Sequence, residues 1–190
     1  MAARLSERFT QALVLAAELH ADQVRKAGGA PYVSHLLGVA SLVLEYGGDE
    51  DAAIAALLHD AAEDQGGRET LDLIRVRFGD RVAGMVEALS DHLEIPKPPW
   101  IERKRAYIAH VREADAMTRL VSAADSLHNV RSFTRDYRRD GEDLWRVFTG
   151  GMKGLVWYYR ELAEVYAEHG PRELAAELTR TLDEFEALSN

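Results

Sequence analysis

The side chains best suited to hydrolytic chemistry lie in one short segment, HDAAED, which spans residues 59–64. It follows an apolar stretch, AAIAALL, that we expect to be buried, and buried polar groups are costly unless something satisfies them. Residues four apart on a helix lie one turn above each other, so His59 aligns with Glu63 and Asp60 with Asp64. A cation held by His59 and Asp60 would therefore have both other acids close to its water or substrate. Taken alone, a His-Asp dipeptide is more often a buried histidine that is hydrogen-bonded to a neighbour.

Three further residues favour a metal site. His35 begins a predicted helix, Asp125 lies in the apolar segment LVSAADSLHN, and Asn129 shares the helix face of Asp125. Each also has an ordinary interpretation, as a core histidine, a surface acid and a solvent-facing amide respectively. Two imidazoles and two carboxylates without sulfur suit Mn²⁺, Fe²⁺, Co²⁺ or Zn²⁺. We favour Mn²⁺, because octahedral coordination leaves positions for water and phosphate oxygens.

With these residues in view, the chain resembles the HD superfamily of metal-dependent phosphohydrolases. Within it, the chain is most similar to the hydrolase domain of RelA/SpoT-type enzymes and to the stand-alone small alarmone hydrolases. The matching blocks occur in the family's order over about residues 16–131. They are HADQVRK from His20, PYVSH from Pro31, AALLHDAAED from Ala55, Phe78-Gly79, ERKR from Glu102 and ADSLHNVR from Ala124.

The resemblance implies a role for particular residues. The implied metal ligands are His35, His59, Asp60 and Asp125, and the implied catalytic acids are Glu63 and Asp64. The positions that match substrate contacts are Arg25, Lys26, Ser34, Asn129, Lys153 and Tyr158, with Tyr32 in the same pocket. Past residue 131 the match weakens, so the contacts of Lys153 and Tyr158 depend on the register of one helix.

The implied activity is hydrolysis of the 3′-diphosphate of guanosine tetra- or pentaphosphate, which yields pyrophosphate and GDP or GTP. A small-molecule nucleotide is then the expected partner. The alternative is another HD phosphohydrolase acting on nucleoside monophosphates, deoxynucleotides or NADPH, with the same metal centre. A third hypothesis is a non-catalytic HD binding module. The native metal, the preferred guanosine nucleotide and the oligomeric state stay open at this point.

Helices must position these residues, because helical periodicity runs through nearly the whole sequence and no strand-length alternation is present. The pattern predicts an all-α, single-domain helical bundle of about eight to ten helices over residues 1–190. The catalytic motifs fall within about 16–131, and helices over about 147–188 complete the core. We expect helix N-caps at Ser6, Asp49 and Asp115.

The segments between the predicted helices are polar. Residues 91–99, DHLEIPKPP, predict a surface loop because of their prolines. One helix is expected to end at Arg131, followed by a charged, irregular segment over 136–143. In this region three arginines interleave with two aspartates, which is typical of a solvated loop; they are Arg135, Arg138, Arg139, Asp136 and Asp140. No partner is predicted for four histidines, His92, His110, His128 and His169.

The composition excludes several classes of protein. The 190 residues include 23 basic and 32 acidic ones, so the formal net charge is −9. We therefore expect neither nucleic acid nor a membrane surface as a partner. Cysteine is absent, which excludes disulfides and thiolate metal sites and favours a cytoplasmic location. The longest strongly apolar run, residues 52–58, is far short of the ~20 residues that span a bilayer, and no signal peptide is expected.

Overall fold

The computed structural model describes residues 4–93 and 96–189, and within them the fold is all-α, as predicted. No strand occurs in these ranges; a single antiparallel bridge joins Val24 and Pro31. The elements are α1 (Glu7–Leu19), α2 (Val33–Glu45), α3 (Glu50–Leu58), α4 (Ala61–Asp64), α5 (Gly67–Phe78), α6 (Asp80–Leu89), α7 (Trp100–Glu113), α8 (Ala116–Asp140), the 3-10 helix η1 (Gly141–Val147), α9 (Gly151–His169) and α10 (Arg172–Leu188).

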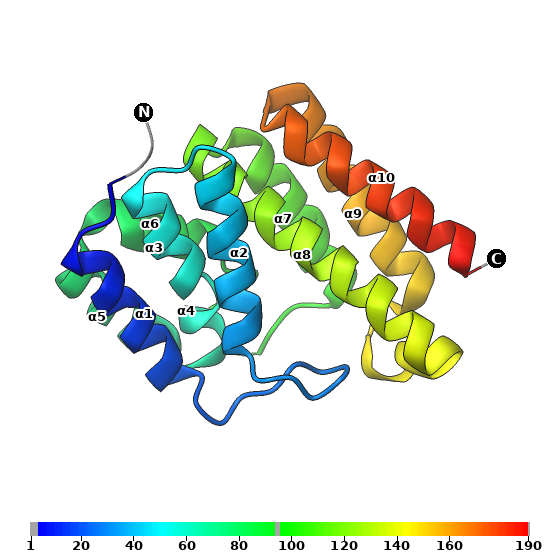
Figure 1. The fold of residues 1–190 in the computed structure, drawn as a ribbon, viewed down its shortest axis with the longest axis horizontal. Helices are drawn as coiled ribbons and strands as arrows, with labels where there is room; N and C mark the ends of the chain where they lie inside the picture. Colours follow the sequence, from blue (N-terminus) through cyan, green and yellow to red (C-terminus); the bar gives the residue numbers. More distant parts are fainter. Residues whose placement is uncertain (1–3, 94–95, 190) are drawn as a thin grey trace.

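The long helix α8 connects the two sides of the molecule. In Figure 1 it runs between α1 to α6 on one side and the antiparallel pair of α9 and α10 on the other. It packs against α2, α3, α6, α7, α9 and α10. The short helix α3 is buried along its length from Ala52 to Leu58 and contacts α1, α2, α6 and α8. Residues at the end of α3 and in the middle of α8 are therefore brought together inside the bundle.

The predicted N-caps explain where three helices begin. The Ser6 hydroxyl accepts a hydrogen bond from the backbone N–H of Arg8, and the Asp49 carboxylate accepts one from Ala52. The Asp115 carboxylate accepts from the N–H groups of two residues in the first turn of α8. Each such cap is worth about 1 kcal/mol, because it satisfies a donor that the helix leaves unpaired.

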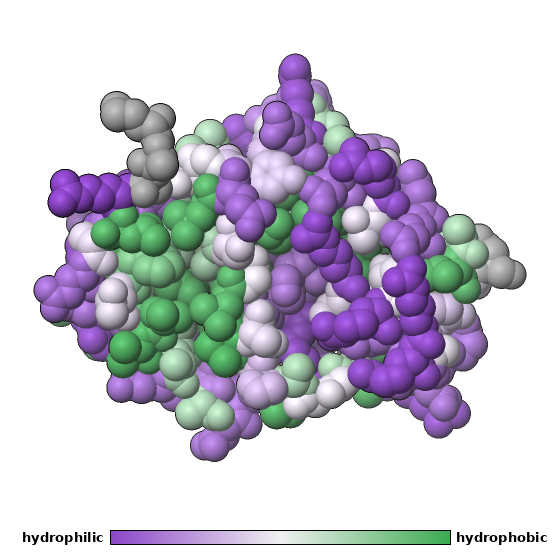
Figure 2. Space-filling view, viewed as in Figure 1, coloured by the Kyte–Doolittle hydropathy of each residue, from purple (hydrophilic) through white to green (hydrophobic). Residues whose placement is uncertain are grey.

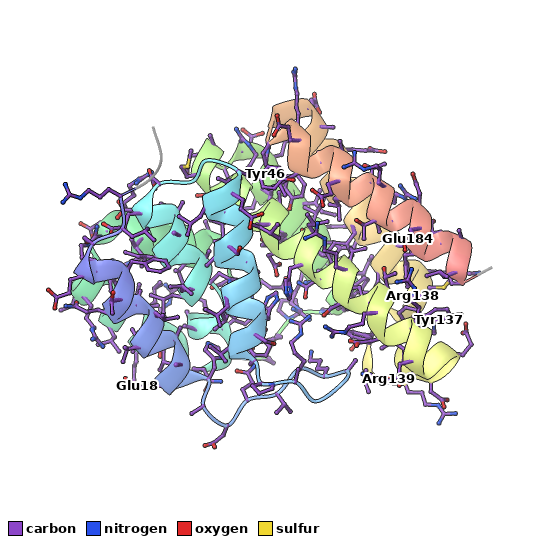
Figure 3. All side chains as sticks on the ribbon, in the orientation of Figure 1. Glu18, Tyr46, Tyr137, Arg138, Arg139 and Glu184 are labelled. Atoms are coloured by element: carbon purple, nitrogen blue, oxygen red, sulfur yellow. The ribbon has the colours of Figure 1, made fainter. Side chains whose placement is uncertain are left out.

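The prediction that the helix ends at Arg131 and that residues 136–143 are irregular is wrong. The helix α8 continues to Asp140, and η1 begins directly after it at Gly141. Two arginines of this helix form ion pairs with α10, Arg131 with Glu177 and Arg138 with Glu184, and the second of these belongs to the segment that was predicted to be a solvated loop. Figure 3 labels the second of these pairs. The partners lie far apart in the sequence, so local pattern alone could not reveal them.

The HDAAED segment consists of a two-residue turn, His59 and Asp60, and the short helix α4. The helix α3 ends at Leu58 and α4 begins at Ala61, but His59 and Asp60 keep right-handed helical dihedral angles. The backbone N–H of Asp64 donates to the carbonyl oxygen of Asp60 at 2.9 Å, a helical i to i+4 bond. The four-residue alignment expected for Asp60 and Asp64 therefore holds despite the break.

The surface differs between the two sides of the view in Figure 2. Apolar side chains gather over α1, α2 and α3, whereas hydrophilic ones cover α8 and α10. Exposed hydrophobic residues on the apolar side include Val14 and Leu37. None of the helices in the described ranges combines the length and the apolar character that crossing a membrane requires.

Candidate metal centre and active site

Two histidines and two aspartates meet where α2, α8 and the α3–α4 turn converge. Donor atoms of His35, His59 and Asp125 all lie within 4.8 Å of one another. The Oδ1 atom of Asp125 is 3.1 Å from Nε2 of His35 and 3.6 Å from Nε2 of His59. The Oδ2 atom of Asp60 is 3.0 Å from Nε2 of His59 and 3.6 Å from Nε2 of His35. All four expected ligands are thus brought together.

The ring of His59 is oriented as a metal ligand requires. Its Nδ1 atom is 2.8 Å from the carbonyl oxygen of Ala56, which can only accept, so Nδ1 carries a proton. Its Nε2 atom is buried and makes no hydrogen bond of acceptable geometry with any described residue. The Nε2 atom and two half-buried carboxylates therefore face one another. This donor set fits a divalent cation with nitrogen and oxygen ligands.

The pKa shifts of His59 and Asp60 also indicate a site for a divalent cation. Burial lowers the pKa of His59, but the carboxylates of Asp60 and Asp125 outweigh it and raise that pKa well above its usual value. Burial opposes ionisation of Asp60, yet His59 and His35 hold the pKa of Asp60 well below its ordinary range. A proton on His59 thus satisfies the carboxylates when no cation does, and a cation has to displace it.

His128, for which no partner is predicted, contacts His35 through the ring nitrogen that does not face Asp125. Its Nδ1 atom is 2.8 Å from Nδ1 of His35, so one ring donates to the other. Burial, followed by the charge of His35, lowers the pKa of His128 to about 4. A neutral His128 fixes the ring of His35 with its Nε2 toward Asp125. A signal for this pair exists in the sequence, since His128 follows Asp125 by three residues on one helix.

The two acids of the HDAAED segment lie in different environments. Glu63 accepts hydrogen bonds from Nζ of Lys97 at 2.8 Å and from the backbone N–H of Asp91 at 2.9 Å. Asp64 accepts one from Nε2 of Gln23 at 2.8 Å. Desolvation first, and then the negative charges of Asp60 and Glu63, raise the pKa of Asp64. Glu63 is thus held by two donors, while the pKa of Asp64 lies above its ordinary value.

A cavity of about 310 Å³ opens beside the metal centre. Its lining includes three cations, Arg25, Lys26 and Lys104. The Arg25 guanidinium donates to Oδ1 of Asn129 at 2.7 Å, and the Asn129 amide donates to Asp125 at the same distance. The Lys104 ammonium lies 4.7 Å from the ring centre of Tyr158, and burial lowers its pKa. The cavity can therefore bind an anionic group next to the cation site.

The structure brings most, but not all, of the expected substrate residues to this cavity. Arg25, Lys26, Asn129 and Tyr158 line it, as do Tyr32, Glu63 and Asp64. Ser34 and Lys153 are exposed and do not line it. Residues without a predicted role in substrate binding line it as well, among them Asp91, Trp100, Lys104, Asp136 and Tyr159. Lys104 lies in the matched ERKR block, which was the available signal for it.

Comparisons with known proteins agree with this geometry. The family described as "HD domain" matches residues 12–155. The guanosine-3′,5′-bis(diphosphate) 3′-pyrophosphohydrolase MESH1 of Xenopus tropicalis is 39% identical over 128 residues, which cover 66% of this chain and 69% of that protein. The guanosine-3′,5′-bis(diphosphate) 3′-pyrophosphohydrolase of Aquifex aeolicus is 38% identical over 128 residues, which cover 67% of this chain and 18% of that longer protein.

Two solved structures share the fold. One is described as a metazoan ortholog of SpoT that hydrolyzes ppGpp; it has a TM-score of 0.78 and 24% identity, and covers 96% of this chain and 98% of its own. A protein of Listeria monocytogenes has a TM-score of 0.67 and 30% identity, over 78% of this chain and 96% of its own. The HD domain match spans well over half of the sequence and encloses the whole metal cluster, and the chain therefore belongs to the HD domain family.

Proposed function

We propose that the chain is a Mn²⁺-dependent hydrolase that removes the 3′-diphosphate from guanosine tetra- or pentaphosphate. Water is consumed, and the products are pyrophosphate and GDP or GTP. One observation carries the proposal: three residues of the His–Asp cluster, His59, Asp60 and Asp125, line the same cavity as the acidic pair and three cations. The names of the relatives from Xenopus tropicalis and Aquifex aeolicus support the choice of substrate.

The metal would be held by His35, His59, Asp60 and Asp125. When bound, a divalent cation polarises a phosphoryl oxygen and lowers the pKa of a coordinated water. Mn²⁺ is preferred over Fe²⁺, Co²⁺ and Zn²⁺ because two carboxylates are hard ligands and octahedral geometry leaves room for phosphate oxygens. Loss of either buried carboxylate would leave the opposing imidazoles without their charge partner.

Asp64 is the group best placed to accept a proton from the attacking water. Its raised pKa brings it closer to the operating pH, which is what an efficient general base needs. Glu63, held by Lys97 and the Asp91 backbone, has a fixed carboxylate that orients the same water. The negative charge of Glu63 also contributes to the raised pKa of Asp64.

Cations of the cavity compensate the charge of the substrate. The chain has a net charge of −9, so phosphate groups are repelled unless placed cations attract them. Arg25 and Lys26 reach the cavity from the α1–α2 loop, and Lys104 reaches it from α7. The same overall charge supports a small-molecule nucleotide, rather than nucleic acid or a membrane surface, as the partner, and the absence of cysteine supports a cytoplasmic location.

The experiment that tests this function is a nucleotide panel with Mn²⁺, read as released pyrophosphate or orthophosphate, together with metal analysis. We expect pyrophosphate from guanosine tetraphosphate. Asp60→Ala should lose the metal, whereas Glu63→Ala should keep it and lose turnover; Glu69→Ala, an exposed acid on α5, is the matched control. Orthophosphate release instead would assign the chain to the HD phosphatases that act on other nucleotides. Normal turnover by Glu63→Ala would overturn the role of the acidic pair.

A further inference from the structure

A buried carboxylate in the cavity wall, Asp136, has no part in the hydrolysis proposed above. It is 3% exposed and lines the cavity together with Asp125, Asn129 and Phe133 of the same helix. Asp136 follows Asp125 by eleven residues, which is close to three full turns, so both face the same side of α8. At ~1.5 Å per residue they are about 16 Å apart along the helix. Asp136 is thus far from the metal centre, at a distance that a metal-held phosphate, a ribose and a purine base can span.

The Asp136 carboxylate is fixed through one of its two oxygens. Its Oδ1 atom is 3.0 Å from Nε of Arg135 and 3.6 Å from Nη1 of Arg139, and both arginine side chains are at least half exposed. Its Oδ2 atom makes no hydrogen bond or ion pair with a described residue. Since a carboxylate oxygen can accept two hydrogen bonds, the group keeps accepting capacity on both oxygens.

The α1–α2 loop closes this end of the cavity. A Cβ atom added to Gly28 would lie 3.1 Å from Nη1 of Arg139 and 3.4 Å from Oδ1 of Asp136. Figure 3 labels Arg139 near the C-terminal end of α8, beside that loop. The loop therefore approaches the carboxylate closely, and the arginines reach it from the outer side.

Aromatic rings stand beside Asp136 in the cavity lining. Phe133, Phe148 and Tyr159 all line the cavity. The ring centre of Phe133 is 5.1 Å from that of Phe148 and 5.8 Å from that of Tyr159. A planar base can pack against such rings, and the polar edge of the base would then meet the carboxylate.

Among purines, guanine matches a carboxylate best. Its N1–H and N2 amino groups are adjacent donors on one edge, and a carboxylate accepts from both at once. Adenine presents an acceptor, N1, at the same place, which a carboxylate repels. Hydrogen bonds to a charged group are stronger than neutral ones, so the difference is large.

We propose that Asp136 is the residue that selects guanine, by accepting hydrogen bonds from its N1–H and N2 amino groups. The inference rests on the proposed function to the extent that the nucleotide phosphate lies at the metal centre. It adds a residue outside the matched blocks that the family resemblance uses.

The test compares the Mn²⁺-loaded chain and its variants on the 3′,5′-bis(diphosphates) of guanosine, inosine and adenosine. Inosine keeps N1–H and lacks the amino group, so it loses one of the two bonds. We expect kcat/KM to fall by about tenfold or more from guanosine to inosine and again to adenosine. Asp136→Ala should flatten this order. Asp136→Asn should shift preference toward adenosine, because its amide matches the N1 acceptor and N6 donor of adenine. The changes should appear in KM, since base recognition is uniform binding.

Matched measurements separate this role from a structural one. Asp140→Asn, which removes the other partner of Arg139, should leave the base preference unchanged. Calorimetric binding of GDP, IDP and ADP to the same proteins gives a readout that needs no turnover. If the wild-type chain prefers GDP but hydrolyses none of the substrates, the proposed function fails and the inference stands. If Asp136→Ala and Asp136→Asn keep the wild-type preference, or lower the affinity for all three bases equally, the inference is overturned.

Discussion

A single added methyl group should weaken metal binding without touching the metal centre. Gly38 lies inside α2, one turn after His35, and a Cβ atom at this position would lie 2.3 Å from both Cδ2 and Nε2 of His128. No Cβ tolerates such a contact, so in Gly38→Ala the His128 ring has to move. Its 2.8 Å contact with Nδ1 of His35 is then lost. A metal-ligating histidine that loses its hydrogen-bond partner typically loses about 10- to 100-fold in metal affinity.

The stability effect of Gly38→Ala combines two opposing contributions. Overpacking a filled site costs about 1–3 kcal/mol, whereas replacing glycine by alanine inside a helix gains about 0.5–1 kcal/mol. The expected net change in the free energy of unfolding is therefore a destabilisation of between about 0 and 2.5 kcal/mol. Gly84→Ala in α6 is the matched control, because nothing lies within 4 Å of its added Cβ atom, and it should show only the gain.

Isothermal titration with Mn²⁺ and urea unfolding, performed on both variants, measure these effects. A double-mutant cycle with His128→Ala isolates the contact, because Gly38→Ala should cost little more once the ring is gone. Wild-type metal affinity in Gly38→Ala would refute the idea that His128 orients His35. Equal losses in Gly38→Ala and Gly84→Ala would refute the steric argument.

Three other outcomes follow from the charges of the site. Because the pKa of His59 is raised in the folded chain, protonated His59 stabilises the metal-free protein fully at pH values below 6.5, the ordinary pKa of histidine. This contribution is lost as pH rises through the folded-state pKa. Calorimetric melting of EDTA-treated protein should therefore show Tm falling as pH rises from 6.5 toward the folded-state pKa, and Mn²⁺ should restore it; a rising Tm would contradict the assignment. Lys97→Met removes the 2.8 Å partner of Glu63 and should lower kcat by about tenfold with bound metal unchanged, as measured by steady-state kinetics and metal analysis. Asp64→Asn should remove the acidic limb of the kcat profile, since a base with a raised pKa loses activity as pH falls through that value.

Local signals were sufficient for the starts of three helices and for two of the four residues of the His–Asp cluster. The caps at Ser6, Asp49 and Asp115 act within one turn, so the sequence around each of them contains the whole interaction. The ligands His59 and Asp60 follow a fully buried helix, which limited the interpretations open to them. The resemblance then supplied His35 and Asp125, whose convergence depends on how α2 and α8 cross.

Interactions between segments that are far apart in the sequence could not be predicted from local pattern. The true end of α8 depends on ion pairs with α10, and each exposed pair contributes only about 0.2–1 kcal/mol. Lys153 and Tyr158 are five residues apart, which is about 140° around a helix, so both cannot point into one cavity. The structure directs Tyr158 inward and Lys153 outward, and Lys104 of α7 supplies the buried cation.

The charges of the cavity determine the order in which ligands can enter it. Its described lining holds six carboxylates, those of Asp60, Glu63, Asp64, Asp91, Asp125 and Asp136. Only three cations, Arg25, Lys26 and Lys104, oppose them there. A polyphosphate would be repelled by this net negative lining in the metal-free chain, because like charges in a partly buried space are poorly screened. A divalent cation on the His–Asp cluster displaces the proton of His59, so the lining becomes less negative by one charge, and the cation itself can attract phosphate oxygens. The carboxylates of the cavity therefore make nucleotide affinity conditional on metal, and they favour binding of the cation before the substrate.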